Sequence, residues 1–394
     1  MFEQGSSSRR YLLLALLYFS EGAPIGYLWW VLPGKLRAAG MPVDRVALLV
    51  AMLALPWTFK FIWAPVVDAV QGPRWGLRAW ITAMQVLMGL TLLPMAFVPL
   101  SAMVGLAFGL VLLHAVCAAT QDVAIDAYAI GMLVARSIFG GLVIYIEPKV
   151  GERAVIVGLI AAVWLSLAAL WLLGERPAVA RRSVGALKGF GRHLKSVATR
   201  RTTWLGLGIA LTAGAGFEAI GGLVSPFLVD EGLAAETRGL FMAFPVVGCM
   251  IVGALVGGFL ADRLAPRRIV GVGVLGIAAW VLVLVGLRYA FPLVPTTVAG
   301  LLLPVYLLLG VLTASLYALL MNLTDPAVAG VQFSTYMGAG NACEAWAVAL
   351  AGALAAGYGY GAGFSVAAVL SLSALPLLAL LPATDKRGHA DERP

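Results

Sequence analysis

Long runs of apolar residues, separated by short polar segments, cover almost the whole chain of 394 residues. A helix needs about twenty mostly apolar residues to cross the roughly 30 Å hydrocarbon core of a bilayer. The first run is longer than the apolar region of a signal peptide, so we expect a retained span. The pattern predicts twelve transmembrane spans, at about Tyr11–Pro33, Val46–Val70, Ala79–Val98, Ala102–Leu133, Val134–Ile146, Ala154–Leu173, Trp204–Leu228, Gly239–Ala261, Ile269–Ala290, Thr297–Leu323, Pro326–Ala356 and Gly361–Leu381.

The predicted fifth span is unusually short. Only ten residues lie between Arg136 and Glu147, and Val134–Ile146 would reach about 20 Å as a helix. Such a segment must borrow flanking residues, tilt little or thin the bilayer locally. We expect twelve spans with a truncated fifth, and the alternative is ten spans with residues 134–174 forming a re-entrant or tilted segment.

One long polar segment, Glu175–Thr203, separates the apolar runs into two groups of six. The predicted domains are an N-terminal helix bundle at 1–174, a basic cytoplasmic linker at 175–203, and a C-terminal helix bundle with a short cytoplasmic tail at 204–394. Two six-helix bundles around a central site are typical of secondary transporters. The fold class predicted is therefore an all-α polytopic membrane protein.

Composition and charge agree with this interpretation. Hydrophobic residues make up 61% of the chain and charged residues 12%, which excludes an ordinary soluble enzyme or a disordered protein. The formal net charge is +8, and 19 of the 27 Lys and Arg residues fall in the segments predicted to be inside, against seven outside. The bias that retains basic residues in cytoplasmic loops places both termini and the linker in the cytoplasm.

Motifs of soluble enzymes are not found in the sequence. The three cysteines lie in apolar runs, so no disulfide framework is predicted. The glycine-rich stretch Gly357–Gly361 lacks a following Lys-Ser or Lys-Thr and is predicted to be a hairpin between spans, not a phosphate loop. We expect no enzyme activity, no cofactor, no metal and no nucleic-acid partner.

Polar residues inside the predicted spans are the best guide to function, because a charge at the bilayer centre costs at least about 2.5–3.5 kcal/mol. The alternative is that these residues pair only to hold helices together. The proton-coupling candidates are Glu21, Asp122, Asp126, Glu218 and Glu344. The substrate-cavity candidates are Tyr27, Lys60, Gln121, Gln332 and Asn341.

Glu21 is followed by Gly22 and Pro24, which are predicted to interrupt the first span. Broken helices near the midplane often line substrate sites, although a proline kink that serves only packing is an equal alternative. Glu218 lies at the matching position of span seven. Glu21 and Glu218 are therefore the favoured proton carriers.

Lys60 is the only Lys or Arg near the middle of a predicted span. It lies about 12 Å from the cytoplasmic end of span two at Asp68, at a depth comparable with Asp122 and Asp126. A pair between Lys60 and one of these carboxylates would neutralise both groups. Our hypothesis is that protonation of the carboxylate releases the lysine and so couples proton binding to opening.

Charged residues at the predicted cytoplasmic helix ends are expected to serve as gating or capping groups. This set comprises Asp68, Arg74, Asp262, Arg263 and Arg267. The pair Asp325-Pro326 predicts the start of span eleven, with Asp325 as the N-cap.

The two-bundle layout and the loops from Asp68 to Arg74 and from Gly257 to Arg268 resemble the major facilitator superfamily. More narrowly, Phe59–Asp68 and Ala119–Ala127 resemble the branch of AmpG-type muropeptide permeases, which also holds acetyl-CoA transporters and siderophore permeases. The stretch from Thr324 through Gln332 to Glu344 is similar to its eleventh helix. Before Ser137 the chain lacks about twenty residues of that pattern.

The resemblance implies proton-driven uptake across a bacterial inner membrane by alternating access. The expected substrate is a polar or amphipathic solute, such as a muropeptide or a siderophore, and a strongly anionic CoA thioester is the least favoured. Expected partners are the solute, protons and the bilayer, with a monomeric protein. The alternative is a non-transporting membrane receptor or assembly factor that retains the transporter fold, which the short fifth span would favour.

Overall fold

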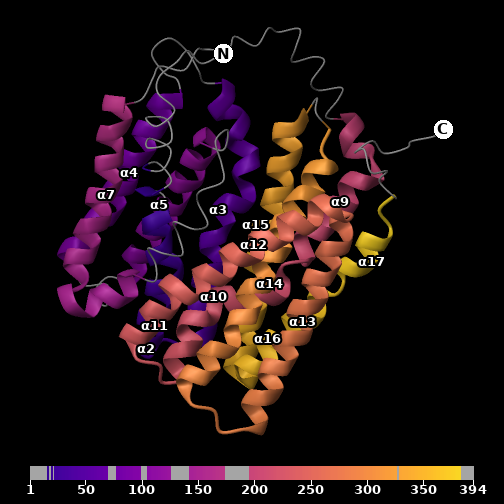
Figure 1. The fold of residues 1–394 in the computed structure, drawn as a ribbon. Helices are drawn as coiled ribbons and strands as arrows, with labels where there is room; N and C mark the ends of the chain where they lie inside the picture. The colour runs from indigo at the N-terminus through magenta and orange to yellow at the C-terminus, as the bar shows by residue number, and fades with distance from the viewer. Residues whose placement is uncertain are drawn as a thin grey trace. The chain divides into compact units, whose positions relative to one another are not determined.

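A computed structural model describes residues 16, 19–20, 22–69, 77–98, 104–125, 142–173, 195–325 and 328–382. The described residues form helices and connecting turns, with no strand among them (Figure 1). The helices are η1 (Tyr27–Val31), α2 (Leu32–Ala38), α3 (Val43–Ala69), α4 (Leu77–Phe97), α5 (Val104–Ile125), α7 (Glu152–Leu173), α9 (Arg201–Thr212), α10 (Ala215–Asp230), α11 (Ala235–Phe241), η4 (Met242–Val246), α12 (Val247–Arg263), α13 (Pro266–Ala290), α14 (Pro295–Asn322), α15 (Ala329–Tyr358), α16 (Tyr360–Ser371) and α17 (Ala374–Ala379). Residues 22–26 and 142–150 are also helical.

Nine helical segments in the described part are long and apolar enough to cross a membrane. They correspond to the predicted spans two, three and six to twelve, and a shorter apolar helix at Phe108–Val123 corresponds to span four. Spans one and five fall partly outside the described residues. The chain is therefore a multi-pass, all-α membrane protein, and the count of twelve stays a prediction.

Two details of the prediction were wrong. Residues 22–26 are helical, so Gly22 and Pro24 do not interrupt the first span, and the irregularity is a π-helical turn at Tyr27–Val31. Pro24 is tolerated there because neighbouring groups in a membrane bundle can satisfy the carbonyl that it leaves without a partner. Helix α15 begins at Ala329 with Val328 as its N-cap residue, so Asp325 does not cap it.

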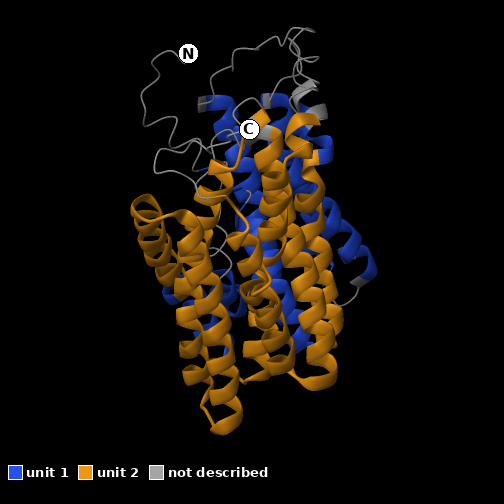
Figure 2. Ribbon diagram, turned by 90° about the vertical axis from the view of Figure 1, so that its right-hand side faces the viewer, with its two compact units in different colours: residues 1–39, 62–180, 233–245 blue, residues 40–61, 181–232, 246–394 orange. Residues whose placement is uncertain are grey.

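The chain packs as two compact units (Figure 2). Unit 1 comprises residues 1–39, 62–180 and 233–245, and unit 2 comprises residues 40–61, 181–232 and 246–394. Each unit combines segments from both predicted bundles, and α3 contributes to both units. The bundle boundaries at 174 and 204 stay a prediction.

In unit 1, α4 packs against both α5 and α7. Gly89 of α4 meets the indole of Trp164 on α7, where a larger residue would collide. His114 of α5 is fully buried, and its Nδ1 lies 3.0 Å from Thr91 Oγ1 and 3.2 Å from the Met88 carbonyl oxygen of α4. A polar contact thus joins two apolar helices in the interior of this unit.

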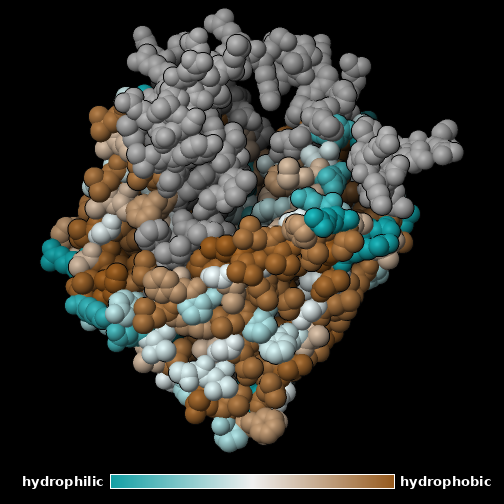
Figure 3. All heavy atoms as spheres, in the orientation of Figure 1, coloured by the Kyte–Doolittle hydropathy of each residue, from teal (hydrophilic) through white to brown (hydrophobic). Residues whose placement is uncertain are grey.

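In unit 2, small residues allow α12 and α14 to approach closely, as is common for transmembrane helix pairs. A Cβ added to Gly257 of α12 would lie 2.6 Å from the carbonyl oxygen of Val311 on α14. Large apolar side chains such as Leu255 and Leu172 remain exposed elsewhere. Hydrophobic residues cover much of the described surface in view (Figure 3), as expected for helices that face lipid.

Candidate functional site

Glu218 lies beside a break in the seventh predicted span. Helix α9 ends at Thr212 and α10 begins at Ala215, with a turn at residues 213–214 between them. The N–H groups of Phe217 and Glu218 both donate to the Gly214 carbonyl oxygen at 2.9 Å. Glu218 is half-buried in the first turn of α10.

Helix α15 places a second carboxylate close to this break. A Cβ on Gly214 would lie 3.4 Å from Glu218 Oε1 and 3.8 Å from Cys343 Sγ of α15. Buried Cys343 interacts electrostatically with Glu218 and with its neighbour Glu344, which is also buried. We call Glu218 and Glu344 the carboxylate pair. Asn341 lies three residues before Glu344 on α15 and is half-buried.

Helix α5 carries two buried polar residues in succession, Gln121 and Asp122. Neither the oxygen nor the nitrogen of the Gln121 amide has a hydrogen-bond partner among the described residues. A buried amide without a partner costs free energy, so this side chain is suited to bind water or a polar solute. Asp126, four residues later, lies outside the described residues.

Lys60 is buried, with 5% of its surface exposed, in the part of α3 that belongs to unit 2. Asp122 belongs to unit 1. Both side chains take part in interactions with other groups. The hypothesis that Lys60 pairs with Asp122 or Asp126 stays a prediction.

A cluster of charged residues lies in unit 1, close to the connections between helices. Lys35 Nζ of α2 lies 2.7 Å from Glu147 Oε1 and 3.0 Å from Glu152 Oε2 of α7. Tyr27 is fully buried and interacts with Glu152. Tyr27 is thus packed within unit 1 beside charged groups, which differs from an aromatic residue at the lipid interface.

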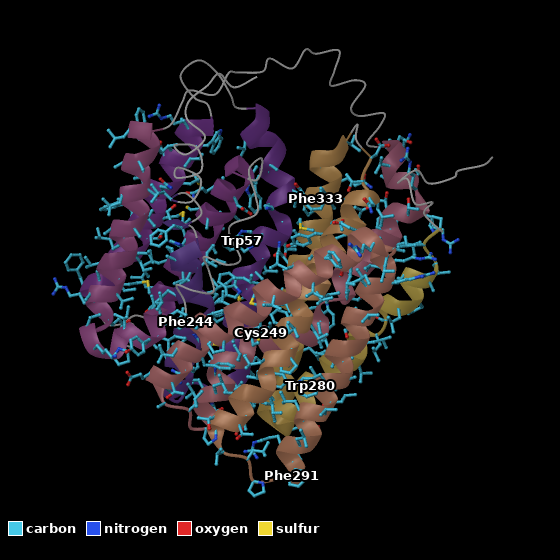
Figure 4. All side chains as sticks on the ribbon, viewed as in Figure 1. Trp57, Phe244, Cys249, Trp280, Phe291 and Phe333 are labelled. Atoms are coloured by element: carbon cyan, nitrogen blue, oxygen red, sulfur yellow. The ribbon has the colours of Figure 1, made fainter. Side chains whose placement is uncertain are left out.

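Gln332 of α15 is the centre of a hydrogen-bond network in unit 2. Its Oε1 accepts from the Asp325 N–H at 2.8 Å, and its Nε2 donates to Tyr336 Oη at 3.0 Å and to Thr203 Oγ1 at 3.3 Å. The next residue is Phe333, which is labelled in Figure 4. Its ring packs edge to face on Tyr317 of α14. Both ends of the Gln332 amide are engaged by the protein, which gives this side chain a clear structural role.

Comparisons with known proteins show similarity to membrane transporters, in agreement with the helical fold. The family described as Acetyl-coenzyme A transporter 1 matches residues 10–108. The Anhydromuropeptide permease of Escherichia coli (strain K12) is 24% identical over 299 residues, which are 68% of this chain and 58% of that protein. The Putative transporter AmpG 3 of Rickettsia typhi is 30% identical over 126 residues, 30% of this chain and 29% of that one.

Among solved structures, the crystal structure of a D-xylose-proton symporter superposes with a TM-score of 0.75, covering 98% of this chain and 100% of that one at 13% identity. The chain is thus similar in sequence to AmpG-type permeases and similar in fold to the D-xylose-proton symporter. It spans less than two thirds of the length of the Escherichia coli relative.

The structure describes only some of the residues that are predicted to gate the transporter. Asp262 and Arg263 are exposed at the end of α12, and the Arg263 guanidinium lies 4.2 Å from the ring centroid of Phe259. Arg267 of α13 donates to the Leu381 carbonyl oxygen at 3.2 Å. Asp68 lies in the last turn of α3, and the structure does not describe its side chain.

Two further candidates, Arg74 and Glu21, also lie outside the described residues of the AmpG-like chain. Glu218 and Glu344 both act electrostatically on the Cys343 thiol in unit 2. Within the described ranges, no group of three or more His, Cys, Asp or Glu side chains could hold a metal ion.

Sequence reasoning missed the partners of Lys35, namely Glu147 and Glu152, together with buried Arg238 in the last turn of α11. All of them lie at the predicted ends of spans, where charges are usually solvated. The signal that could have found them is the unusual density of charge around the short fifth span, between Glu147 and Arg153.

Proposed function

We propose that this protein is a proton-coupled secondary transporter of the bacterial inner membrane, with both termini in the cytoplasm. It imports a polar or amphipathic solute by alternating access and acts as a monomer. The observation that carries this proposal is the carboxylate pair beside the break between α9 and α10. The superfamily fold supports transport, and two carboxylates at a broken helix support coupling to protons.

The carboxylate pair lies inside two predicted spans, where a carboxylate can serve as a proton carrier. An ionised carboxylate inside a membrane span is costly, and binding a proton removes the charge. A proton that binds here would change the electrostatic balance between α10 and α15. That change can favour one conformation of the transporter over another.

The proposed substrate class is muropeptide-like or siderophore-like. The Escherichia coli relative is an anhydromuropeptide permease by name, which favours the first of these. The buried amide of Gln121 and the half-buried Asn341 offer neutral hydrogen-bonding groups. Lys60 is the only Lys or Arg near the middle of a predicted span, so a strongly anionic substrate is disfavoured.

The test is uptake by the purified full-length protein in proteoliposomes that contain a pH-sensitive dye. Labelled anhydromuropeptide and an iron-siderophore chelate are added with and without an imposed proton gradient. We expect one of them to enter and to acidify the lumen. Glu218→Gln and Glu344→Gln should each reduce coupled proton entry by about 100-fold, as expected when an essential proton-binding group is lost.

The matched control is Glu231→Gln, at the other end of α10. Glu231 accepts hydrogen bonds from Arg288 Nε at 2.9 and 3.1 Å and lies outside the predicted spans. This variant should transport normally. Binding of a solute without uptake would support the receptor alternative and overturn the proposal. Normal proton entry in Glu218→Gln and Glu344→Gln would remove the carboxylate pair from the mechanism.

A second part of the proposal concerns Lys60. If Lys60 pairs with Asp122 or Asp126, protonation of that carboxylate releases the lysine and permits opening. Lys60→Met should then transport slowly and lose the normal dependence of uptake on pH. Normal transport with an unchanged pH profile would disprove the coupling role of Lys60.

A further inference from the structure

Helices α4 and α7 lie side by side in unit 1 (Figure 1), and an arginine stacks on an aromatic ring at each end of the pair. At one end, the Arg78 guanidinium of α4 lies 4.2 Å from the ring centroid of Trp171 of α7. At the other end, the Arg153 guanidinium of α7 lies 5.5 Å from the ring centroid of Phe97 of α4. Each helix begins with an arginine and ends with an aromatic residue, so the two helices run antiparallel.

The separation of the two arginine–aromatic contacts matches the thickness of a membrane. Arg78 and Phe97 are 19 residues apart on α4, which is about 28 Å of helix. Arg153 and Trp171 are 18 residues apart on α7, or about 27 Å. The hydrocarbon core of a bilayer is about 30 Å thick, and aromatic rings and the charged ends of arginine side chains collect at its two boundaries. Both contacts therefore fall at the level of the lipid headgroups.

The surface of α7 between the two contacts is apolar and exposed. Val157, Trp164 and Trp171 follow Arg153 at spacings of four, seven and seven residues, so all four share one face of the helix. The three apolar side chains are 50%, 38% and 59% exposed, and we call them the α7 stripe. Gly89 of α4 leaves room for the indole of Trp164 beside it. Such a stripe suits the acyl chains of a lipid.

The two arginines have no carboxylate partner among the described residues. Glu152, the neighbour of Arg153, pairs instead with Lys35 at 3.0 Å. Arg78 Nη2 donates to the Trp171 carbonyl oxygen at 2.8 Å, which leaves further N–H donors of the guanidinium for an acceptor from outside the protein. Arginine binds phosphate through short, charge-assisted hydrogen bonds, and phosphate is the anion found at the headgroup level.

The ring that supports Arg78 is held in position by the protein itself. Trp171 Nε1 donates to Thr82 Oγ1 of α4 at 3.2 Å, and Thr82 Oγ1 in turn donates to the Arg78 carbonyl oxygen at 2.7 Å. The indole, the hydroxyl and the guanidinium are therefore arranged before any ligand arrives. Preorganisation of this kind lowers the entropic cost of binding.

We propose that the α4–α7 surface binds two phospholipids, one in each leaflet, with the phosphate of one lipid on Arg78, the phosphate of the other on Arg153, and the acyl chains on the α7 stripe. A lipid with a net negative headgroup binds more tightly than phosphatidylcholine, because the ammonium of choline competes for the phosphate. The two lipids fix the depth of unit 1 in the bilayer. The site needs no transport activity, so it is independent of the proposed function.

The test counts bound lipids by native mass spectrometry of the purified full-length protein, titrated in detergent with phosphatidylglycerol or phosphatidylcholine. We expect two phosphatidylglycerol molecules to bind more tightly than any others. Arg78→Gln and Arg153→Gln should each weaken one of them by about fivefold, as expected for loss of one basic group at a membrane surface. The double variant should weaken both, and phosphatidylcholine should show smaller effects.

Two further variants separate the site from general charge and from loss of structure. Arg45 of α3 is exposed and makes no ion pair or ring contact with the described residues, so Arg45→Gln should bind both lipids normally. Trp171→Leu keeps an apolar side chain but removes the ring, and it should weaken only the lipid at Arg78. The midpoint of thermal unfolding without lipid should be the same in all variants, whereas phosphatidylglycerol should raise it less in Arg78→Gln and Arg153→Gln.

Three outcomes would overturn the lipid site. One is unchanged phosphatidylglycerol binding in the double variant of Arg78 and Arg153. Another is an equal loss of binding in Arg45→Gln, which would show that net charge alone attracts the lipid. The third is complete displacement of the lipid by an equimolar amount of glycerol phosphate, because a site that also holds acyl chains on the α7 stripe must prefer the lipid.

Discussion

Gly352 of α15 and Ala47 of α3 approach so closely that a Cβ on Gly352 would overlap the Cβ of Ala47. Nearer the other end of the contact, a Cβ on Gly338 would lie 2.6 Å from the Thr58 carbonyl oxygen. Residue numbers rise along α3 as they fall along α15, so the two helices run antiparallel. Two glycines, about 21 Å apart on α15, thus allow close packing within unit 2.

Gly352→Val should push α3 away from α15, because backbone and Cβ atoms of α3 cannot rotate aside. Overpacking of this kind costs about 1–3 kcal/mol. We expect the midpoint of thermal unfolding in detergent to fall, and transport to be impaired in the same variant. The measurement is a thermal scan followed by intrinsic fluorescence.

The matched control for Gly352 is Gly340 on the same helix, where a Cβ would meet no atom within 4 Å. Gly340→Ala should be neutral or stabilising by up to about 1 kcal/mol, because alanine favours the helix. If Gly352→Val and Gly340→Ala behaved alike, the close contact with Ala47 would not limit packing.

Two buried glutamines provide a second comparison. Gln332 uses both ends of its amide, and its oxygen satisfies the N–H of Asp325. Gln85 of α4 donates to Ser20 Oγ at 3.0 Å and to Ser166 Oγ at 2.9 Å, but its oxygen has no partner among the described residues. Removing Gln85 therefore also removes an unsatisfied acceptor.

Gln332→Leu should lower the free energy of unfolding by about 1–3 kcal/mol, because it leaves a buried N–H without its acceptor. Gln85→Leu should cost less than about 1 kcal/mol, since hydrogen bonds between membrane helices average about 0.6 kcal/mol. Denaturation in mixed micelles of increasing sodium dodecyl sulfate measures both. A larger loss for Gln85→Leu would contradict this ranking.

Much of the fold was predictable because membrane helices can be identified in a sequence by their length and apolar composition. The predicted span Ile269–Ala290 corresponds to α13 at Pro266–Ala290, and Thr297–Leu323 to α14 at Pro295–Asn322. Breaks within spans were not predictable in this way, because the turn before Glu218 follows no proline and interrupts an otherwise apolar run. The predicted start of α15 at Asp325-Pro326 was wrong, since the helix begins at Ala329.

The candidate site was predictable only in part. The cost of charge in a bilayer indicates Glu218 and Glu344 from sequence alone, but their shared proximity to Cys343 depends on how α10 and α15 pack. The role of Gln332 also depends on packing, because its partners come from α9 and from the end of α14. Sequence position identifies such residues as polar and interior, without saying what they contact.

The ion pair between Asp325 and Arg200 is expected to make only a small contribution to stability. Arg200 Nη1 lies 3.0 Å from Asp325 Oδ2, with side chains 42% and 17% exposed. Arg200→Gln should therefore lower stability by less than about 1 kcal/mol, and 0.5 M salt should reduce the difference from the unmodified protein. Micelle denaturation at low and high salt measures it.

The neighbouring Arg201 is exposed and makes no ion pair within the described residues, so Arg201→Gln is the matched control. It should have no measurable effect at either salt concentration. Equal losses in the two variants would show that general charge, and not the contact with Asp325, is responsible.

Gly359 forms the turn between α15 and α16 with φ of +84° and ψ of 161°. This backbone conformation is open almost only to glycine, so Gly359→Ala should cost about 1–3 kcal/mol even though the nearest atom, Tyr289 Oη, is 3.5 Å from the added Cβ. Gly357→Ala, two residues earlier in the helical end of α15, meets no atom within 4 Å and should be neutral. Thermal scans of the two variants test for backbone strain, because neither added Cβ is crowded and only Gly359 has a positive φ. If the midpoint of thermal unfolding fell in both variants, the cause would be a change at the end of α15 as a whole and not strain at Gly359. An unchanged midpoint for Gly359→Ala would contradict the strained turn.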